Sequence, residues 1–163
     1  MKNEKLKMKN GREILNTMRL EIPAISENES FARGVVSAFA TQINPTMEEI
    51  DDIKTAVSEA VTNCVVHAYQ KRQSKDDKII IECAMYDGEI EIKITDNGVG
   101  IPDIKKAMQP FFTTILDGER SGMGFTVMES FTDYLCVNNN VQGGTVVIMK
   151  KFFTKEERKV SGS

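Results

Sequence analysis

The stretch Ser58-Glu59-Ala60-Val61-Thr62-Asn63-Cys64-Val65-Val66-His67 decides the fold. Glu59, Asn63 and His67 recur at every fourth residue, a spacing that places three polar side chains on one face of a helix. A separate apolar stripe also follows helical spacing and consists of Ile53, Ala56, Val57, Ala60, Val61, Cys64 and Val65. Amide and carboxylate oxygens suit Mg²⁺, and a carboxylate beside a transferred phosphate can accept a proton, so the pattern fits catalysis on a metal-bound nucleotide. The alternative is an ordinary amphipathic helix whose solvent face carries Glu and Asn.

Length and composition limit the class of protein. The 163 residues suit one domain with a buried core, and the net charge of −3 provides no basic surface for nucleic acid. No apolar run approaches the roughly 20 residues that cross a bilayer, and the N-terminus lacks a hydrophobic signal core. Cys64, Cys83 and Cys136 lack metal-ligand spacing and are expected to be small core residues in a reducing cytoplasm. We therefore expect a cytoplasmic protein with no nucleic-acid or membrane partner.

Periodicity and turn residues predict the order of the elements. Helices are expected over 26–41 and 46–69, with Ser26 and Thr46 as N-caps. In the first helix, Phe31, Val35 and Phe39 are expected to face the core. Strands are expected over residues 19–22, 78–86, 89–94, 134–137 and 145–152, with Asp87-Gly88 as a hairpin turn. Residues 101–121 carry only a weak helical patch near Lys105, which predicts a mobile functional loop, and an apolar helix follows through Phe131.

This layout predicts one α+β domain, a two-layer sandwich of helices on a mixed, mainly antiparallel sheet. Residues 1–17 are rich in Lys and Asn and are expected to form a flexible N-terminal extension. The domain is expected to span residues 18–153, followed by a disordered tail over residues 154–163.

Two glycine motifs point to a nucleotide. Asp96-Asn97-Gly98-Val99-Gly100 ends a strand, where a buried carboxylate can accept the amino group of adenine and glycines let a ligand approach the backbone. The alternative there is a plain Asn-Gly turn. Arg120-Ser121-Gly122-Met123-Gly124-Phe125 enters a helix whose free N–H groups, helped by the arginine, can bind phosphate. The alternative is glycine at a helix boundary; P-loop and dinucleotide-binding fingerprints do not occur.

The order and spacing of these motifs, completed by Gly144-Thr145 before the last strand, resemble the GHKL ATPase and kinase superfamily over about residues 18–153. The resemblance implies the Bergerat ATP-binding fold, with ATP and Mg²⁺ as cofactors. It implies that Glu59 is the catalytic base, that Asn63 binds Mg²⁺ and that Asp96 recognises adenine. It also implies that Arg120 acts in catalysis by contacting the γ-phosphate. The other nucleotide-binding residues that it implies are Gly98, Gly100, Thr113, Thr114, Ser121, Gly122, Met123, Gly124, Phe125 and Thr145, the last assisting Asp96.

Four motifs are similar to one branch of that superfamily, the sporulation anti-sigma F family of serine kinases. They are Asn28-Glu29-Ser30-Phe31-Ala32-Arg33, Ser58-Glu59-Ala60-Val61-Thr62-Asn63, Phe112-Thr113-Thr114 and Glu119-Arg120-Ser121-Gly122-Met123-Gly124-Phe125. The resemblance implies a homodimer that binds and inhibits sigma F and phosphorylates a serine on an anti-anti-sigma protein of the STAS type. It implies partner contacts at Glu29 and Arg33, which otherwise form an exposed ion pair one helical turn apart.

The resemblance leaves other functions to be weighed. One is an ATP-sensing binding module, and another is a GHKL ATPase without protein phosphotransfer. An intact Glu59 favours the kinase, because a module without turnover needs no base. His67 follows the Asn63 turn and is either a structural or a catalytic residue. As the only histidine in the chain, it leaves no helical phospho-acceptor for chemistry of the histidine-kinase type.

Overall fold

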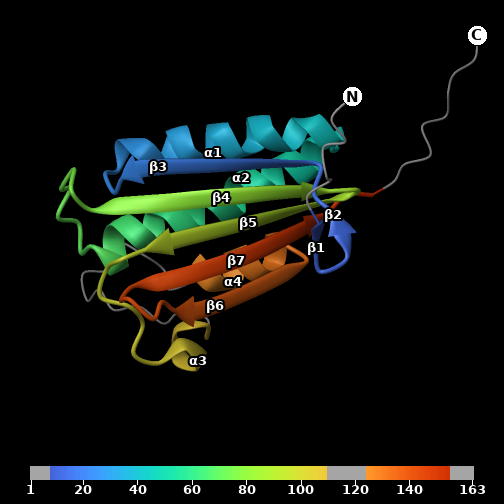
Figure 1. Ribbon diagram of the computed structural model, residues 1–163. Helices are drawn as coiled ribbons and strands as arrows, with labels where there is room; N and C mark the ends of the chain where they lie inside the picture. Colours follow the sequence, from blue (N-terminus) through green and yellow to red (C-terminus); the bar gives the residue numbers. More distant parts are fainter. Residues whose placement is uncertain (1–7, 110–123, 155–163) are drawn as a thin grey trace, which may run out of the picture.

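The computed structural model describes residues 8–109 and 124–154, which form helices packed on one face of a five-stranded sheet (Figure 1). The strands are β3 (Asn16–Pro23), β4 (Lys78–Tyr86), β5 (Glu89–Asp96), β6 (Tyr134–Asn139) and β7 (Thr145–Phe152). Their order in the sheet is β3-β4-β5-β7-β6, and all four neighbouring pairs are antiparallel. The helices are α1 (Glu27–Ala40), α2 (Met47–Asn63), α3 (Ile104–Ala107) and α4 (Gly124–Phe131). The predicted α+β two-layer fold is confirmed, with a sheet that is antiparallel throughout rather than mixed.

The core lies between the sheet and α1, α2 and α4. Alternate residues of β4 and β5 face the helices, as the period of two requires; they are Ile79, Ile81, Cys83, Met85, Ile90, Ile92 and Ile94. Every member of the predicted apolar stripe is buried; five of the seven lie on α2, and Cys64 and Val65 follow it directly. Cys64 and Cys83 are buried free thiols as expected, whereas Cys136 is only half-buried on β6. Within the described ranges, every helix is too short or too polar to span a bilayer.

The start of α2 confirms the predicted cap. Thr46 accepts a hydrogen bond from the Glu49 backbone N–H at 3.1 Å, and the Glu49 side chain accepts one from the Thr46 N–H at 3.0 Å. This reciprocal capping box satisfies two N–H groups that a helix start leaves unpaired. The expected helix over 46–69 is continuous, but its end, Cys64–Ala68, is a π-helical turn. Such turns often occur at functional sites, because the inserted residue changes the register of the side chains that follow.

The first helix corrects two expectations. Ser26 makes no side-chain cap; its hydroxyl oxygen instead accepts a hydrogen bond from the Gln73 side-chain amide. Phe31 is 51% exposed and does not face the core. The buried apolar residues of α1 are Ala32, Val36, Phe39 and Ala40. Ala32 and Val36 each follow directly after a residue that was predicted to be buried. One residue corresponds to about 100° of rotation around a helix, so Phe31 points outward. Only Phe39 of the three aromatic and aliphatic residues predicted to face the core is fully buried.

The N-terminal residues that the structure describes differ from the expected flexible extension. Strands β1 (Met8–Lys9) and β2 (Arg12–Glu13) form a small hairpin, and β3 begins at Asn16. Arg12 pairs with Glu89 and lies over the Tyr86 ring, 4.4 Å from its centroid. Lys9 donates a hydrogen bond to Glu91 at 2.8 Å. Charge contacts with the sheet therefore hold this segment, and its polar composition alone does not reveal them.

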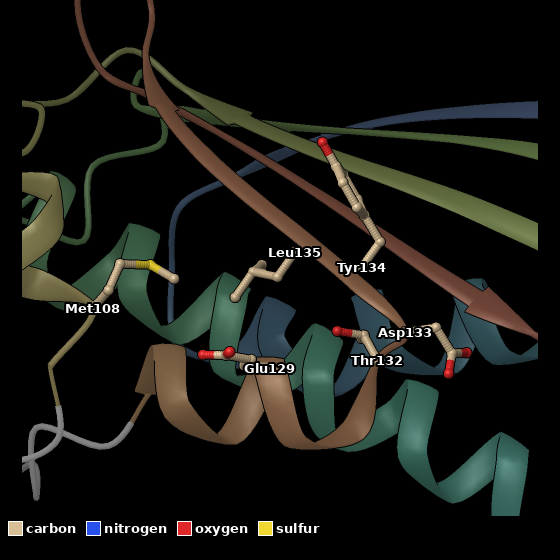
Figure 2. A pocket seen from close by; sticks show the side chains of 6 residues that line it. All are labelled: Met108, Glu129, Thr132, Asp133, Tyr134 and Leu135. Carbon is tan, nitrogen blue, oxygen red and sulfur yellow. The ribbon is translucent and has the colours of Figure 1, made fainter.

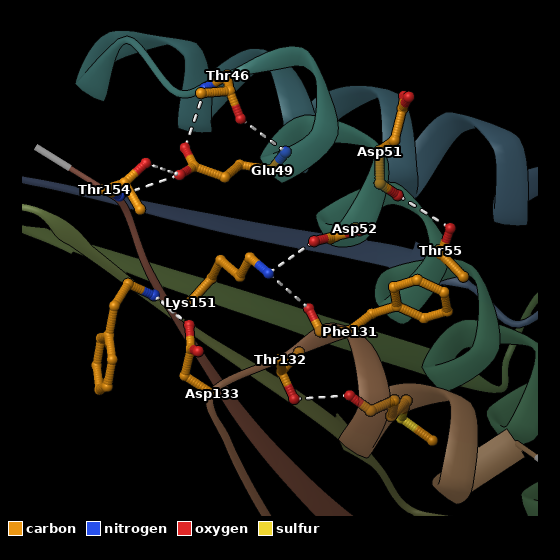
Figure 3. Close-up of polar contacts among 12 residues, drawn as sticks. Thr46, Glu49, Asp51, Asp52, Thr55, Phe131, Thr132, Asp133, Lys151 and Thr154 are labelled. Carbon is orange, nitrogen blue, oxygen red and sulfur yellow. Dashed lines mark hydrogen bonds and ion pairs between the residues drawn. The ribbon is translucent and has the colours of Figure 1, made fainter. Parts of the chain in front are cut away.

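Hydrogen bonds tie the end of the last strand to α2 and α4 (Figure 3). Lys151, whose side chain is 12% exposed, donates to Asp52 of α2 at 2.8 Å and to the carbonyl of Phe131 at the C-terminus of α4 at 3.1 Å. Glu49 accepts hydrogen bonds from the backbone N–H and the hydroxyl of Thr154. Burial raises the pKa of Glu49, but these bonds and the Lys151 charge outweigh it and lower the pKa overall. The lowered pKa means that this carboxylate stabilises the fold at neutral pH and loses that effect as the pH falls through its folded-state value.

Lys151→Ala is expected to lower the free energy of unfolding by about 1–2 kcal/mol, because it leaves the half-buried Asp52 carboxylate and the last carbonyls of α4 without their cation. Urea unfolding at pH 7 measures the difference. Lys150→Ala is the matched control, since Lys150 lies at 4.0 Å from Glu91 and is more exposed. Equal losses in the two variants would contradict a specific role for Lys151.

Candidate nucleotide-binding and catalytic site

The last two turns of α2 lie against the start of α4. A β-carbon placed on Gly124 would lie 3.1 Å from both terminal atoms of the Asn63 amide and 3.4 Å from the Glu59 carboxylate. Glu59 and Asn63 are both half-buried, on the same face of α2 as their spacing predicts. Gly124 therefore lets the N-terminus of α4, an end that favours anions, approach a carboxylate and an amide. A larger residue at position 124 would push these groups apart.

A second polar group lies at the end of β5. Asp96 is 4% exposed, and its Oδ1 accepts hydrogen bonds from the backbone N–H groups of Gly98 at 3.0 Å and Thr145 at 3.2 Å. Its Oδ2 lies 3.6 Å from the thiol of Cys64, which donates to it. Burial raises the pKa of Asp96, while these three hydrogen bonds act in the opposite direction. Asp96 is thus a buried acceptor held by donors from three separate segments.

Glycines make the approach of these segments possible. Gly144 has φ +86°, and a β-carbon there would lie 2.0 Å from the Asp96 carbonyl oxygen. A β-carbon on Gly98 would lie 2.3 Å from the carbonyl oxygen of Ala68, which accepts a hydrogen bond from the Val99 N–H. Gly100 has φ +74°. The loop after β5 is therefore packed on the π-helical turn, and the bend before β7 is packed on Asp96.

The helix α2 and its π-helical turn connect the two polar groups. Asn63 is the last residue of α2, and Cys64, which contacts Asp96, comes next in the chain. One continuous helical segment thus carries Glu59 and Asn63 toward α4 and a thiol toward Asp96. The backbone N–H of Thr145 donates to Asp96, and the part of Thr145 in adenine binding that the resemblance implies stays a prediction. His67 lies half-buried on the π-helical turn.

Several predicted site residues are not described. Residues 110–123, which include Thr113, Thr114, Arg120, Ser121, Gly122 and Met123, lie outside the described ranges, as does most of the loop expected over 101–121. Its described part contains α3, capped by the Asp103 side chain, which confirms the helical patch predicted near Lys105. Phe125 is half-buried and packs against the hydrophobic core.

Glu29 and Arg33 connect α1 to the segment of α2 that carries Glu59 and Asn63. The Thr62 hydroxyl donates to Glu29 at 2.9 Å, and Arg33 donates to the Ser58 hydroxyl oxygen at 3.3 Å. The direct ion pair between Glu29 and Arg33 is long, at 3.9 Å. Ser58 and Thr62 precede Glu59 and Asn63 in the chain, so these contacts adjoin the polar face of α2. Both charged side chains remain partly accessible to a partner.

The sequence motifs do not identify three residues that contact the site. Cys64 is assigned only to the core from sequence, although it donates to Asp96. The Tyr69 hydroxyl accepts from the Asn97 N–H at 2.8 Å and donates to the Lys78 carbonyl at 2.6 Å. The Asn139 side-chain amide accepts from the Ile101 N–H and donates to the Ile101 carbonyl. Tyr69 and Asn139 thus fix the two ends of the Asp96–Gly100 loop. The sequence signal for this role is that each residue lies at the end of a helix or strand.

A shallow hollow of about 240 Å³ lies between α4 and β6 (Figure 2). Its lining residues are Met108, Glu129, Thr132, Asp133, Tyr134 and Leu135. Glu129 and Thr132 come from the C-terminal half of α4 and from just beyond it, whereas Gly124 begins that helix. Among the described residues, none of the predicted site residues lines this hollow.

A known protein family matches most of this chain. The histidine kinase-like ATPase domain family matches residues 22–151. The chain is 54% identical over 138 residues to an anti-sigma F factor of Clostridium botulinum, a match covering 85% of this chain and 95% of the relative. It is 55% identical over 137 residues to an anti-sigma F factor of Caldanaerobacter subterraneus, covering 84% and 94%.

Solved structures share the fold at low identity. The RsbU and RsbW domains of a Mycobacterium tuberculosis protein match with a TM-score of 0.63 at 19% identity, over 86% of this chain and 33% of that one. The catalytic domain of the histidine kinase ThkA matches with a TM-score of 0.53 at 17% identity, over 84% and 97%. The sequence matches extend over most of both chains and include the α2, β5 and α4 segments of the site. The chain therefore belongs to the histidine kinase-like ATPase domain family and, within it, to the anti-sigma F factor family.

Proposed function

We propose that the chain is an ATP-dependent protein serine kinase that also acts as an anti-sigma factor. In this proposal it binds and inhibits sigma F as a homodimer in the cytoplasm and phosphorylates a STAS-type anti-anti-sigma protein, which controls sporulation transcription. The observation that carries the proposal is the approach of Gly124 to Glu59 and Asn63. That contact joins a candidate base, a candidate metal ligand and a helix N-terminus suited to phosphate in one place.

The chemistry requires a base beside the transferred phosphoryl group. The seryl oxygen forms a bond to the γ-phosphorus while the bond from that phosphorus to the β–γ bridging oxygen breaks, and ADP leaves. Glu59 accepts the seryl proton, since its carboxylate lies beside the start of α4 together with the Asn63 amide. The N-terminal N–H groups of α4 stabilise the negative charge of the phosphates. Arg120 is proposed to contact the γ-phosphate.

The donor set fits a magnesium nucleotide. Asn63 offers an amide oxygen, a hard ligand that suits Mg²⁺ together with phosphate oxygens. When bound, the ion neutralises charge on the phosphates. The described residues contain no group of three or more His, Cys, Asp or Glu side chains that could hold a metal ion. Asp96 is proposed to accept the exocyclic amino group of adenine at the other end of the nucleotide.

The test is transfer of radiolabel from γ-labelled ATP. The purified chain, Mg²⁺ and a candidate STAS-type protein are mixed, and the fate of the label is followed. Label on a serine of the added protein supports the kinase. Free labelled phosphate without protein labelling favours an ATPase, and ATP binding with neither product favours an ATP-sensing module. A substrate protein with its acceptor serine replaced by alanine is the matched control.

Arg33→Glu is expected to weaken the complexes with sigma F and with the anti-anti-sigma protein by at least about tenfold, because it reverses a half-exposed charge on the proposed partner surface. It also removes the bond to Ser58, so the free energy of unfolding is expected to fall by up to about 1 kcal/mol. ATP affinity should stay unchanged. Co-elution, urea unfolding and nucleotide titration measure the three quantities.

Arg19→Glu is the control for this variant, because Arg19 is an exposed arginine on β3 that pairs only loosely with Glu21, at 3.5 Å. Both partner complexes should survive that change. If Arg33→Glu binds both partners as the wild type does, the partner surface lies elsewhere, whatever the outcome for the kinase.

A further inference from the structure

The Asp96 carboxylate has nearly all of its acceptor capacity filled by the protein. A carboxylate offers about four lone-pair positions. Oδ1 uses two of them for the N–H groups of Gly98 and Thr145, and Oδ2 uses one for the Cys64 thiol at 3.6 Å. One position remains, on the same oxygen that the thiol contacts. Any amino group that Asp96 recognises therefore shares Oδ2 with Cys64.

The Cys64 thiol donates to that oxygen from a buried position. Cys64 is 4% exposed and belongs to the π-helical turn, directly after Asn63. A cysteine thiol carries its proton at neutral pH and can donate it to a carboxylate oxygen. The two N–H bonds hold only Oδ1, so among the described residues the thiol is the hydrogen-bond donor that fixes the direction of Oδ2. It also supplies a dipole to a negative charge in an apolar setting, where hydrogen bonds to charged groups are strongest.

We propose that Cys64 is a positioning residue for adenine recognition, which orients Oδ2 of Asp96 toward the exocyclic amino group and thereby sets the selectivity for 6-aminopurines. This proposal rests on the adenine-binding role of Asp96 within the proposed function. Cys64 itself touches no nucleotide in this arrangement; it acts through the carboxylate. The sequence pattern alone gives the residue no such role, because it belongs to the apolar stripe that is expected to be buried in the core.

Nucleotides that differ only at the amino group test the proposal. ATP and purine riboside triphosphate, which lacks the 6-amino group, are titrated against the full chain in the presence of Mg²⁺. Wild-type protein is expected to prefer ATP. In Cys64→Ala this preference is expected to shrink by about 3- to 10-fold, because Oδ2 loses its orienting donor. In Cys64→Ser the preference should be retained, since the hydroxyl also donates.

The ratio of the affinities for ATP and for purine riboside triphosphate distinguishes an effect of Cys64 on nucleotide recognition from an effect on the stability of the fold. Both nucleotides bind the same folded protein, so a loss of stability in Cys64→Ala cancels in the ratio. Cys83→Ala is the matched control, because Cys83 is a buried thiol on β4 whose pKa is raised to about 12 by burial alone. Its preference for ATP should equal that of the wild type. A wild-type ratio in Cys64→Ala would overturn the proposal.

A spectroscopic signature tests the contact without nucleotide. The S–H stretching band of Cys64, assigned by difference from Cys64→Ala, is expected to move to higher frequency in Asp96→Asn, because the amide nitrogen that replaces Oδ2 cannot accept the hydrogen bond of the thiol. An unmoved band would overturn the positioning role of Cys64 and leave the proposed function intact. If the wild type binds both nucleotides equally, the adenine role of Asp96 fails in the proposed function, and this inference fails with it.

Discussion

Glu59→Gln is expected to lower phosphotransfer to the protein substrate by about 10²- to 10⁴-fold, the usual effect of removing a general base. Glutamine keeps the length and the hydrogen-bonding oxygen of glutamate, so the packing of Gly124 against this face of α2 should survive. ATP binding should therefore remain within about threefold of the wild type, because the base acts in the transition state rather than in nucleotide binding. Single-turnover transfer from γ-labelled ATP and equilibrium titration measure the two effects separately.

Glu48→Gln provides the matched control for that variant. Glu48 is an exposed glutamate on the first turn of the same helix, remote from Gly124. It should transfer phosphate at the wild-type rate. Near wild-type transfer by Glu59→Gln would remove Glu59 from the chemistry, and loss of ATP binding in Glu59→Gln would instead indicate a role in holding the nucleotide.

The sequence predicts the layers of the fold well because its signals are local. Strict alternation in β5, the Asp87-Gly88 turn and the apolar stripe of α2 each specify an element from neighbouring residues. The capping box at Thr46 is equally local. Long-range contacts decide the features that sequence analysis predicted wrongly. The orientation of Phe31 depends on which face of α1 meets α2, and the N-terminal hairpin depends on ion pairs with β5.

The distinction between local signals and long-range contacts also applies to the site. Spacing places Glu59 and Asn63 on one face, and a motif ending a strand indicates Asp96. Cys64 and Thr145, two of the three donors to Asp96, lie 32 and 49 residues from it in the chain, so the local motif around Asp96 contains only the third donor, Gly98. The glycines illustrate this point. Gly144 is required by a close approach to the Asp96 backbone, a contact that the sequence alone does not reveal.

Asp96→Asn is expected to weaken ATP binding by about 10- to 100-fold, the cost of an unmade hydrogen bond to a charged acceptor. The asparagine oxygen can still accept from Gly98 and Thr145 at the position of Oδ1. Its amide nitrogen then replaces Oδ2 and presents donors to both the Cys64 thiol and the amino group of adenine. Two donors that face each other cannot form the contact that the carboxylate forms.

The base specificity of this variant distinguishes recognition from general damage to the site. Wild-type protein is expected to bind GTP far more weakly than ATP, because guanine has an acceptor where adenine has its amino group. In Asp96→Asn the affinity for ATP should fall while that for GTP stays similar or rises, so the preference shrinks. Asp76→Asn, an exposed aspartate in the loop before β4, is the control and should keep the preference. Equal wild-type affinities for ATP and GTP would contradict adenine recognition by Asp96, because a buried carboxylate with one acceptor position left cannot serve both bases equally.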